Sequence, residues 1–304
     1  MTGATRSRLL ILCLATVYLV WGSSYAATRI GVQHLPPLLF GGIRFTLAGL
    51  LMLGIAGARG LRLADVRGEW RHVAVMGFVG VTFVNGLQVW AMQWVPSQTG
   101  ALLNASSAFW IVAFGLFGCR AHRPGARVLT GIAIGFVGVG LLVWPGLGAP
   151  TATRLLPQLV ILVSCVGWAV ATIYLRNIHT GLDVIALTAL QMLIGGIVLV
   201  LLGVARGETE AWHWSAPGLL SMAWLTVFSA CCAYTAYAWL AQNATPAQVG
   251  TYSYVNPAIA TLVGYLLLDE VLTPVQLLGT AVIVGGVLLV NWPTTESFRE
   301  PISD

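Results

Sequence analysis

Neutral polar and aromatic side chains lie inside long apolar stretches of this chain. Trp21 and Tyr25 are four residues apart and Asn85 and Gln88 are three apart, so each pair shares one helix face. Amides and rings in such surroundings hold a small solute by hydrogen bonds and ring contacts. We therefore predict a binding cavity lined by Trp21, Tyr25, Asn85, Gln88, Asn104, Trp168, Tyr237, Tyr254 and Asn256. Two alternatives stay open: rings near the ends of apolar stretches often anchor a protein at a membrane surface, and amides also bond across packed helices.

Arg44 is a cation inside an apolar stretch, about eight residues or about 12 Å along the helix from its start. Two interpretations of this position stay open. The side chain snorkels to the outer surface, or it is a fixed charge that attracts a substrate carboxylate or closes an outer gate.

The apolar stretches lack the groups that most chemistry needs. None has Asp, Glu, Lys or His in its central third. Exporters that exchange cationic drugs for protons use carboxylates buried in the membrane, so this function is less favoured. No His, Cys, Asp and Glu cluster has metal-ligand spacing, and Asp269-Glu270 has no histidine beside it for catalysis. We expect no metal, no cofactor and no enzyme activity.

The composition explains where these residues must sit. Of 304 residues, 58% are hydrophobic and 8% are charged, and the mean hydropathy is +0.85. A soluble domain carries about a quarter charged residues, so disorder, a secreted disulfide scaffold and a soluble enzyme are excluded. The net charge of +5 is small and scattered, which argues against nucleic-acid binding. The chain is predicted to be an integral protein of the lipid bilayer.

Hydropathy predicts ten membrane spans, over residues 9–28, 36–58, 73–94, 97–118, 126–145, 157–176, 183–204, 217–241, 246–268 and 274–292. If the N-terminus is inside, the inner loops hold eleven arginines: Arg6, Arg8, Arg59, Arg62, Arg67, Arg71, Arg120, Arg123, Arg127, Arg176 and Arg299. The outer loops then hold Arg29, Arg154 and Arg206. This bias predicts that both termini are cytoplasmic.

The two halves of the chain resemble each other. Trp21 meets Trp168 at an offset of 147, the P-x-Q-x-G motif of residues 96–100 meets that of 246–250 at 150, and Gly138 meets Gly286 at 148. We therefore predict two five-span repeats, residues 1–147 and 148–304, of which the second is inverted because five is odd. The repeat counterpart of Arg44 is Gln191, so this charge is one-sided.

Several motifs carry a resemblance to a known family. Trp21-Gly22-Ser23-Ser24, Arg44-Phe45 and the stretch from Asn256-Pro257-Ala258 to Asp269-Glu270 resemble the EamA-type branch of the drug/metabolite transporter superfamily. The resemblance implies an all-α inner-membrane protein of ten helices. It also implies a substrate cavity between the repeats, lined by the first, third and fourth spans of each repeat.

The sequence departs from that family pattern in the first repeat. Ala108 stands near a position where the family usually has Pro, and Arg120 is the counterpart of Glu270. We therefore expect the fourth span to be less kinked than its counterpart in the second repeat. There Pro257 lacks a backbone amide and is predicted to be a hinge or a substrate contact. Arg44, Pro257 and Glu270 are the predicted gating residues.

These observations favour a transporter that exports or exchanges small amino-acid-like metabolites by alternating access. Without a deep acid, uniport or exchange is more natural than tight proton coupling, although coupling through Glu270 or a water chain stays open. The alternative is an exporter of drug-like aromatic compounds that uses the same cavity. A membrane-embedded enzyme is a third possibility, and the oligomeric state is left open.

Overall fold

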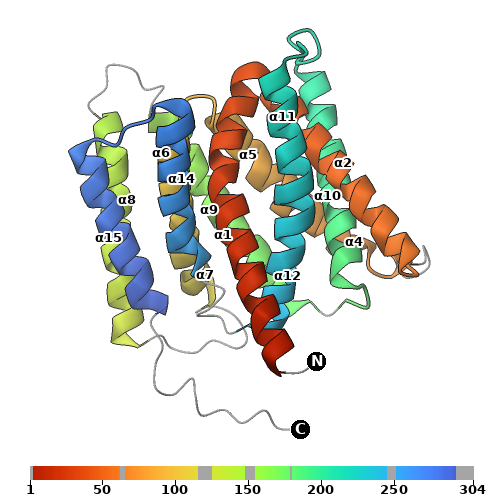
Figure 1. Ribbon diagram of the computed structural model, residues 1–304, viewed down its shortest axis with the longest axis horizontal. Coiled ribbons are helices and arrows are strands. Elements are labelled where there is room, and N and C mark those ends of the chain that lie inside the picture. The colour runs from red at the N-terminus through yellow and green to blue at the C-terminus, as the bar shows by residue number, and fades with distance from the viewer. Residues whose placement is uncertain are drawn as a thin grey trace.

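Long helices run side by side in the computed structural model, which describes residues 3–61, 66–115, 125–147, 155–178, 180–244 and 251–291 (Figure 1). The first half contains α1 (Gly3–His34), α2 (Pro37–Ala58), α4 (Trp70–Met76), η1 (Gly77–Phe83), α5 (Val84–Ala91), α6 (Ser97–Ala105), α7 (Ser107–Gly115) and α8 (Ala126–Leu147). The second half contains α9 (Leu155–Asn177), α10 (Val184–Ala205), α11 (Ala216–Trp224), η2 (Leu225–Ala233), α12 (Tyr234–Asn243), α14 (Tyr252–Leu268) and α15 (Pro274–Asn291). Within the described ranges all regular structure is helical, as predicted.

Six helical segments of the described chain are long and apolar enough to cross a membrane. They are Thr5–His34, Pro37–Ala58, Trp70–Ala91, Leu155–Leu175, Val184–Ala205 and Ala216–Leu240. Three shorter apolar helices cover Ala126–Leu141, Val255–Leu268 and Pro274–Leu289. The start of α1 and the end of α15 lie on the same side of the bundle (Figure 1). Several residues used to predict the repeat and the orientation lie outside the described ranges: Arg62, Arg120, Arg123, Arg154, Arg299, Pro246, Gln248 and Gly250.

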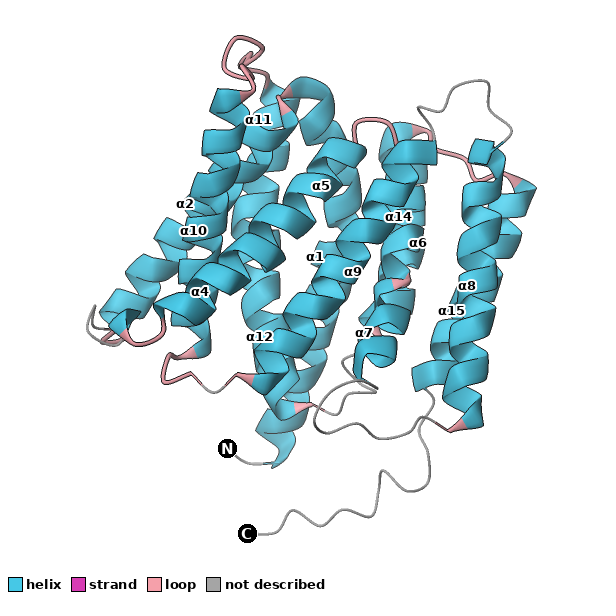
Figure 2. Cartoon of the chain, turned by 180° about the vertical axis from the view of Figure 1, so that it is seen from behind, coloured by secondary structure: helices cyan, strands magenta, loops and turns pink. Residues whose placement is uncertain are grey.

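Glycines bring two helix pairs into close contact at opposite edges of the bundle (Figures 1 and 2). Where α2 crosses α10, a Cβ on Gly42 would lie 2.6 Å from the backbone nitrogen of Val200. Where α8 crosses α15, a Cβ on Gly138 would lie 2.8 Å from the backbone nitrogen of Ile283. Small residues allow such backbone approach in membrane helices. Gly138 therefore serves close packing of α8 against α15.

Both predicted third spans contain a π-helical segment that the sequence did not reveal. In the first half η1 joins α4 to α5, and in the second η2 joins α11 to α12. The segments begin at Gly77 and Leu225, which the repeat offset of 148 superimposes. A π-helix shifts the backbone hydrogen bonds by one residue and is often found at functional sites.

The fourth spans differ from the expectation. The first-half span is interrupted, because α6 ends at Ala105 and α7 begins at Ser107. At the break the Ser106 amide donates to the carbonyl of Leu103 (3.1 Å) and the Phe109 amide donates to that of Ser106 (2.9 Å). These i→i−3 bonds tighten the turn more than α-helical bonds do. In contrast, α14 is helical through Pro257, so the break in the helix lies in the span that lacks proline, and the expected order of kinking remains a prediction.

Candidate functional site

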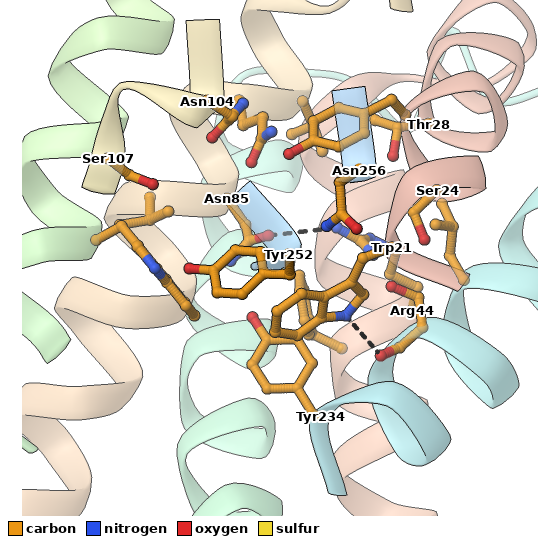
Figure 3. Close-up of a pocket in the computed structure, with 18 residues that line it drawn as sticks. Trp21, Ser24, Thr28, Arg44, Asn85, Asn104, Ser107, Tyr234, Tyr252 and Asn256 are labelled. Carbon is orange, nitrogen blue, oxygen red and sulfur yellow. Dashed lines mark hydrogen bonds between the residues drawn. The ribbon is translucent and has the colours of Figure 1, made fainter. Parts of the chain in front are cut away.

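A cavity of about 130 Å³ lies between helices of the two halves (Figure 3). One water molecule needs roughly 10–15 Å³, so the space suits a small solute. The lining residues are Trp21, Ser24, Tyr25, Thr28, Arg44, Phe45, Val84, Asn85, Gln88, Val89, Asn104, Ser107, Trp168, Leu225, Ser229, Tyr234, Tyr252 and Asn256. They come from the predicted first, third and fourth spans of each half and from α2.

Seven of the nine predicted binding residues line this cavity: Trp21, Tyr25, Asn85, Gln88, Asn104, Trp168 and Asn256. Tyr237 lies behind the lining, with its ring centroid 5.1 Å from that of Trp21. The side chain of Tyr254 lies outside what the structure describes. Of the predicted gating residues, Arg44 lines the cavity, whereas Pro257 and Glu270 do not.

Several lining residues are not among the nine predicted ones, although helical periodicity places them beside predicted residues. Tyr252 is one turn before Asn256, Thr28 is about one turn after Tyr25, and Tyr234 is one turn before Tyr237. Ser229 had no such signal, because it lies in the π-helical segment η2.

Arg44 is buried in the cavity wall and does not reach the outer surface. Its side chain is 6% exposed, and its guanidinium carbon lies 4.2 Å from the ring centroid of Phe45. One guanidinium nitrogen, Nη2, donates to Oδ1 of Asn85 at 3.5 Å. The Nε group has no hydrogen-bond partner in the described part of the chain. The snorkelling interpretation of Arg44 therefore does not fit the structure.

Asn85 is held by the π-helical segment that precedes it. Its side-chain amide Nδ2 donates to the carbonyl oxygen of Gly80, five residues earlier, at 3.0 Å. That bond turns Oδ1 toward Arg44, as Figure 3 shows. The local backbone of η1 thus sets the direction of the amide that contacts the guanidinium.

A cluster of rings forms another part of the wall and joins α1 to three helices of the second half. The ring of Trp21 lies 6.5 Å from that of Trp168, 5.3 Å from Tyr234 and 5.6 Å from Tyr252, measured between centroids. Its indole nitrogen donates to the carbonyl of Ser229 at 3.4 Å. Such edge-to-face contacts are favourable, so the cluster is a well-defined surface for an apolar or aromatic group.

Two asparagines place amide groups on the cavity. Asn104 donates to the carbonyl of Gly100 at 3.0 Å, and its Oδ1 accepts from the thiol of Cys165 at 3.7 Å. Asn256 is 4% exposed, and its Oδ1 has no partner among the described residues. A buried acceptor without a donor is costly, so the structure leaves this amide of the cavity wall unsatisfied.

Glu270 lies outside the cavity and joins the two halves at the start of α6. Its Oε1 accepts from the Ser97 amide (2.8 Å), and its Oε2 accepts from the Ser97 hydroxyl (2.7 Å) and the Gln98 amide (3.2 Å). A carboxylate is favourable there because the first amides of a helix lack partners and carry positive charge. The gating role predicted for Glu270 remains a prediction.

Replacing Glu270 by glutamine should lower the thermal stability of the protein. The amide keeps one acceptor but loses the charge and cannot accept all three bonds, at a cost of about 1–2 kcal/mol. Thermal unfolding in detergent tests this. Glu210→Gln, at an exposed position, is the control. Equal midpoints for Glu270→Gln and the wild type would show that the contact contributes nothing.

Within the described ranges no group of three His, Cys, Asp or Glu residues is placed to hold a metal ion.

Comparison with known proteins decides the family. The model of the EamA-like transporter family matches residues 8–144 and again residues 155–292. The chain belongs to the EamA-like transporter family. This EamA-like protein is 33% identical over 280 residues to the uncharacterized inner membrane transporter YedA of Escherichia coli strain K12, covering 91% of this chain and 89% of YedA. It is 29% identical to the uncharacterized transporter YvbV of Bacillus subtilis, covering 94% of this chain and 92% of YvbV.

More distant similarity extends to plants and to a solved structure. The chain is 23% identical to the chloroplastic WAT1-related protein At3g02690 of Arabidopsis thaliana, over 92% of this chain and 69% of that one. The structure is also similar to a known crystal structure, with a TM-score of 0.67 and 19% sequence identity. The match covers 96% of this EamA-like chain and 99% of the chain in that crystal structure. At that identity the similarity shows a shared fold. The family match and the long apolar helices together identify the EamA-like protein as a multi-pass membrane transporter.

Proposed function

We propose that this EamA-like transporter exports or exchanges small amino-acid-like metabolites by alternating access. The observation that carries the proposal is the cavity between the halves, which combines amides, hydroxyls, aromatic rings and one guanidinium. Solutes with an apolar part and a few hydrogen-bonding groups match such a lining. Substrate sites between structural repeats are typical of transporters that work by alternating access.

Ten spans in two inverted repeats are part of this proposal. It is supported by the two family matches, one in each half, and by the two π-helical segments at equivalent positions. The glycine contacts of α2 with α10 and of α8 with α15 agree with it, because each pair joins equivalent spans. We place the repeats at residues 1–147 and 148–304.

We also propose that the protein lies in the cell inner membrane with both termini in the cytoplasm. The location is supported by the similarity to YedA, which is named as an inner membrane transporter. The excess of arginines in one set of loops supports the cytoplasmic termini.

The charges around the cavity support uniport or exchange as part of this proposal. The lining that the structure describes contains no Asp, Glu, Lys or His. It thus offers no carboxylate to a proton or to a cationic drug. The ring cluster around Trp21 favours one second candidate, export of drug-like aromatic compounds that carry no positive charge.

Counterflow in liposomes tests the proposed function. Purified protein is reconstituted, the vesicles are loaded with excess unlabelled amino acids, and uptake of labelled ones is followed with and without a pH gradient. We expect the same uptake of labelled amino acid with and without the pH gradient. Uptake that needs the gradient would contradict uniport or exchange. Uptake of neutral aromatic drugs alone would contradict the amino-acid-like substrate class.

A further inference from the structure

Arg44 carries a positive charge that the described protein does not neutralise. Among the described residues its Nε has no hydrogen-bond partner, and its hydrogen bond to Asn85 is long, at 3.5 Å. The described structure forms no ion pair between Arg44 and a carboxylate, and the described acidic residues lie at helix ends or in loops. Ionised residues inside membrane spans are costly and are usually paired or line a pathway.

The surroundings of Arg44 hold it in place without satisfying it. The face of Phe45 supports the guanidinium, and Asn85 is fixed by its own bond to the Gly80 carbonyl. A planar guanidinium offers five donors in a fork that matches a carboxylate. Arg44 lines the cavity and its hydrogen bond to Asn85 uses one of these donors, so donors remain for a bound anion.

We propose that Arg44 binds the carboxylate of the transported solute and that Asn85 is its positioning residue. This inference rests on the proposed function and narrows its substrate class to solutes with a free carboxylate. Amines made by decarboxylation, and esters of the same acids, lack the group that Arg44 binds.

Charge and polarity restrict the ligand further. The described lining has one cation and no acid, so a single negative charge on the ligand is balanced there. A phosphate dianion would leave one charge without a partner in the cavity. Asn256 adds an unpartnered acceptor in the same cavity, which suits an amino group. The combination fits a solute that carries one carboxylate and an N–H donor.

The experiment measures binding and counterflow for matched solutes. Phenylalanine is compared with phenylalanine methyl ester and phenethylamine, using tryptophan fluorescence in detergent for binding and proteoliposomes for counterflow. On the wild type we expect the acid to bind at least about tenfold more tightly than the ester or the amine, the loss of one charged contact. This comparison needs no variant and holds whether or not a variant folds.

Variants at Arg44 locate the effect. The Arg44→Gln variant should bind the acid about tenfold or more weakly than the wild type and should bind the amine no more tightly. The Arg44→Lys variant should keep part of the affinity for the acid. Asn85→Ala should weaken acid binding less than Arg44→Gln, and Arg206→Gln, outside the cavity, is the matched control. Acid binding that is equal in wild type and Arg44→Gln, or equal for acid and ester, would overturn this inference alone. A folded wild type that binds and transports no carboxylate would overturn it together with the proposed function.

Discussion

Replacing Gly42 by leucine is expected to abolish the accumulation of folded protein. A Cβ at Gly42 would lie 2.6 Å from the backbone nitrogen of Val200 and 2.9 Å from the carbonyl oxygen of Gly196. Backbone atoms of α10 cannot move aside as a flexible side chain does, so α2 and α10 must separate. Overpacking of a core costs about 1–3 kcal/mol, and this contact with backbone atoms lies at the upper end of that range.

The measurement is the yield of monodisperse protein after membrane extraction, together with its thermal midpoint. Gly54→Leu in the same helix is the control, because a Cβ there meets nothing within 4 Å. A Gly42→Leu protein with the yield and midpoint of the wild type would contradict the described contact between α2 and α10.

Replacing Trp21 by alanine should remove most substrate binding. The indole contacts rings from α9, α12 and α14 and donates to the carbonyl of Ser229 in η2. Its loss removes a wall of the cavity and leaves the neighbouring rings without support. Buried tryptophans at binding surfaces contribute about 2–4 kcal/mol, which corresponds to about 30-fold or more in affinity.

Binding and counterflow of phenylalanine, measured side by side, check this result. Trp144→Ala is the matched control, because that tryptophan is 65% exposed on α8. Trp21→Phe should keep part of the ring contacts and recover part of the affinity. A folded Trp21→Ala protein with wild-type affinity would exclude this wall from the substrate site.

Seven of the nine predicted residues line one cavity because hydropathy and the repeat place polar residues on defined helix faces. Trp21 and Trp168 were paired by the repeat, and their rings lie 6.5 Å apart. Asn85 and Gln88 share a face and both line the cavity. Helical periodicity predicts the face on which a side chain lies, so it also predicts that Tyr252 and Tyr234 line the cavity.

Features that depend on tertiary contacts could not be predicted in this way. The π-helical segments η1 and η2 break the α-helical period without a proline or other local signal. The interruption at Ser106 falls in a span that lacks proline, whereas α14 accommodates Pro257. The contact of Glu270 with Ser97 joins residues 173 positions apart, which no local pattern reveals.

Alternating access requires that the cavity open to each side of the membrane in turn. Ser107 lines the cavity and is 5% exposed, and Ser107→Cys in a protein without native cysteines reports on access. We would label this variant with a membrane-impermeant maleimide from the outside and, in inverted vesicles, from the inside, with and without phenylalanine. We expect labelling from either side and protection by phenylalanine in both orientations. Labelling from one side alone, unchanged by phenylalanine, would contradict alternating access around this cavity.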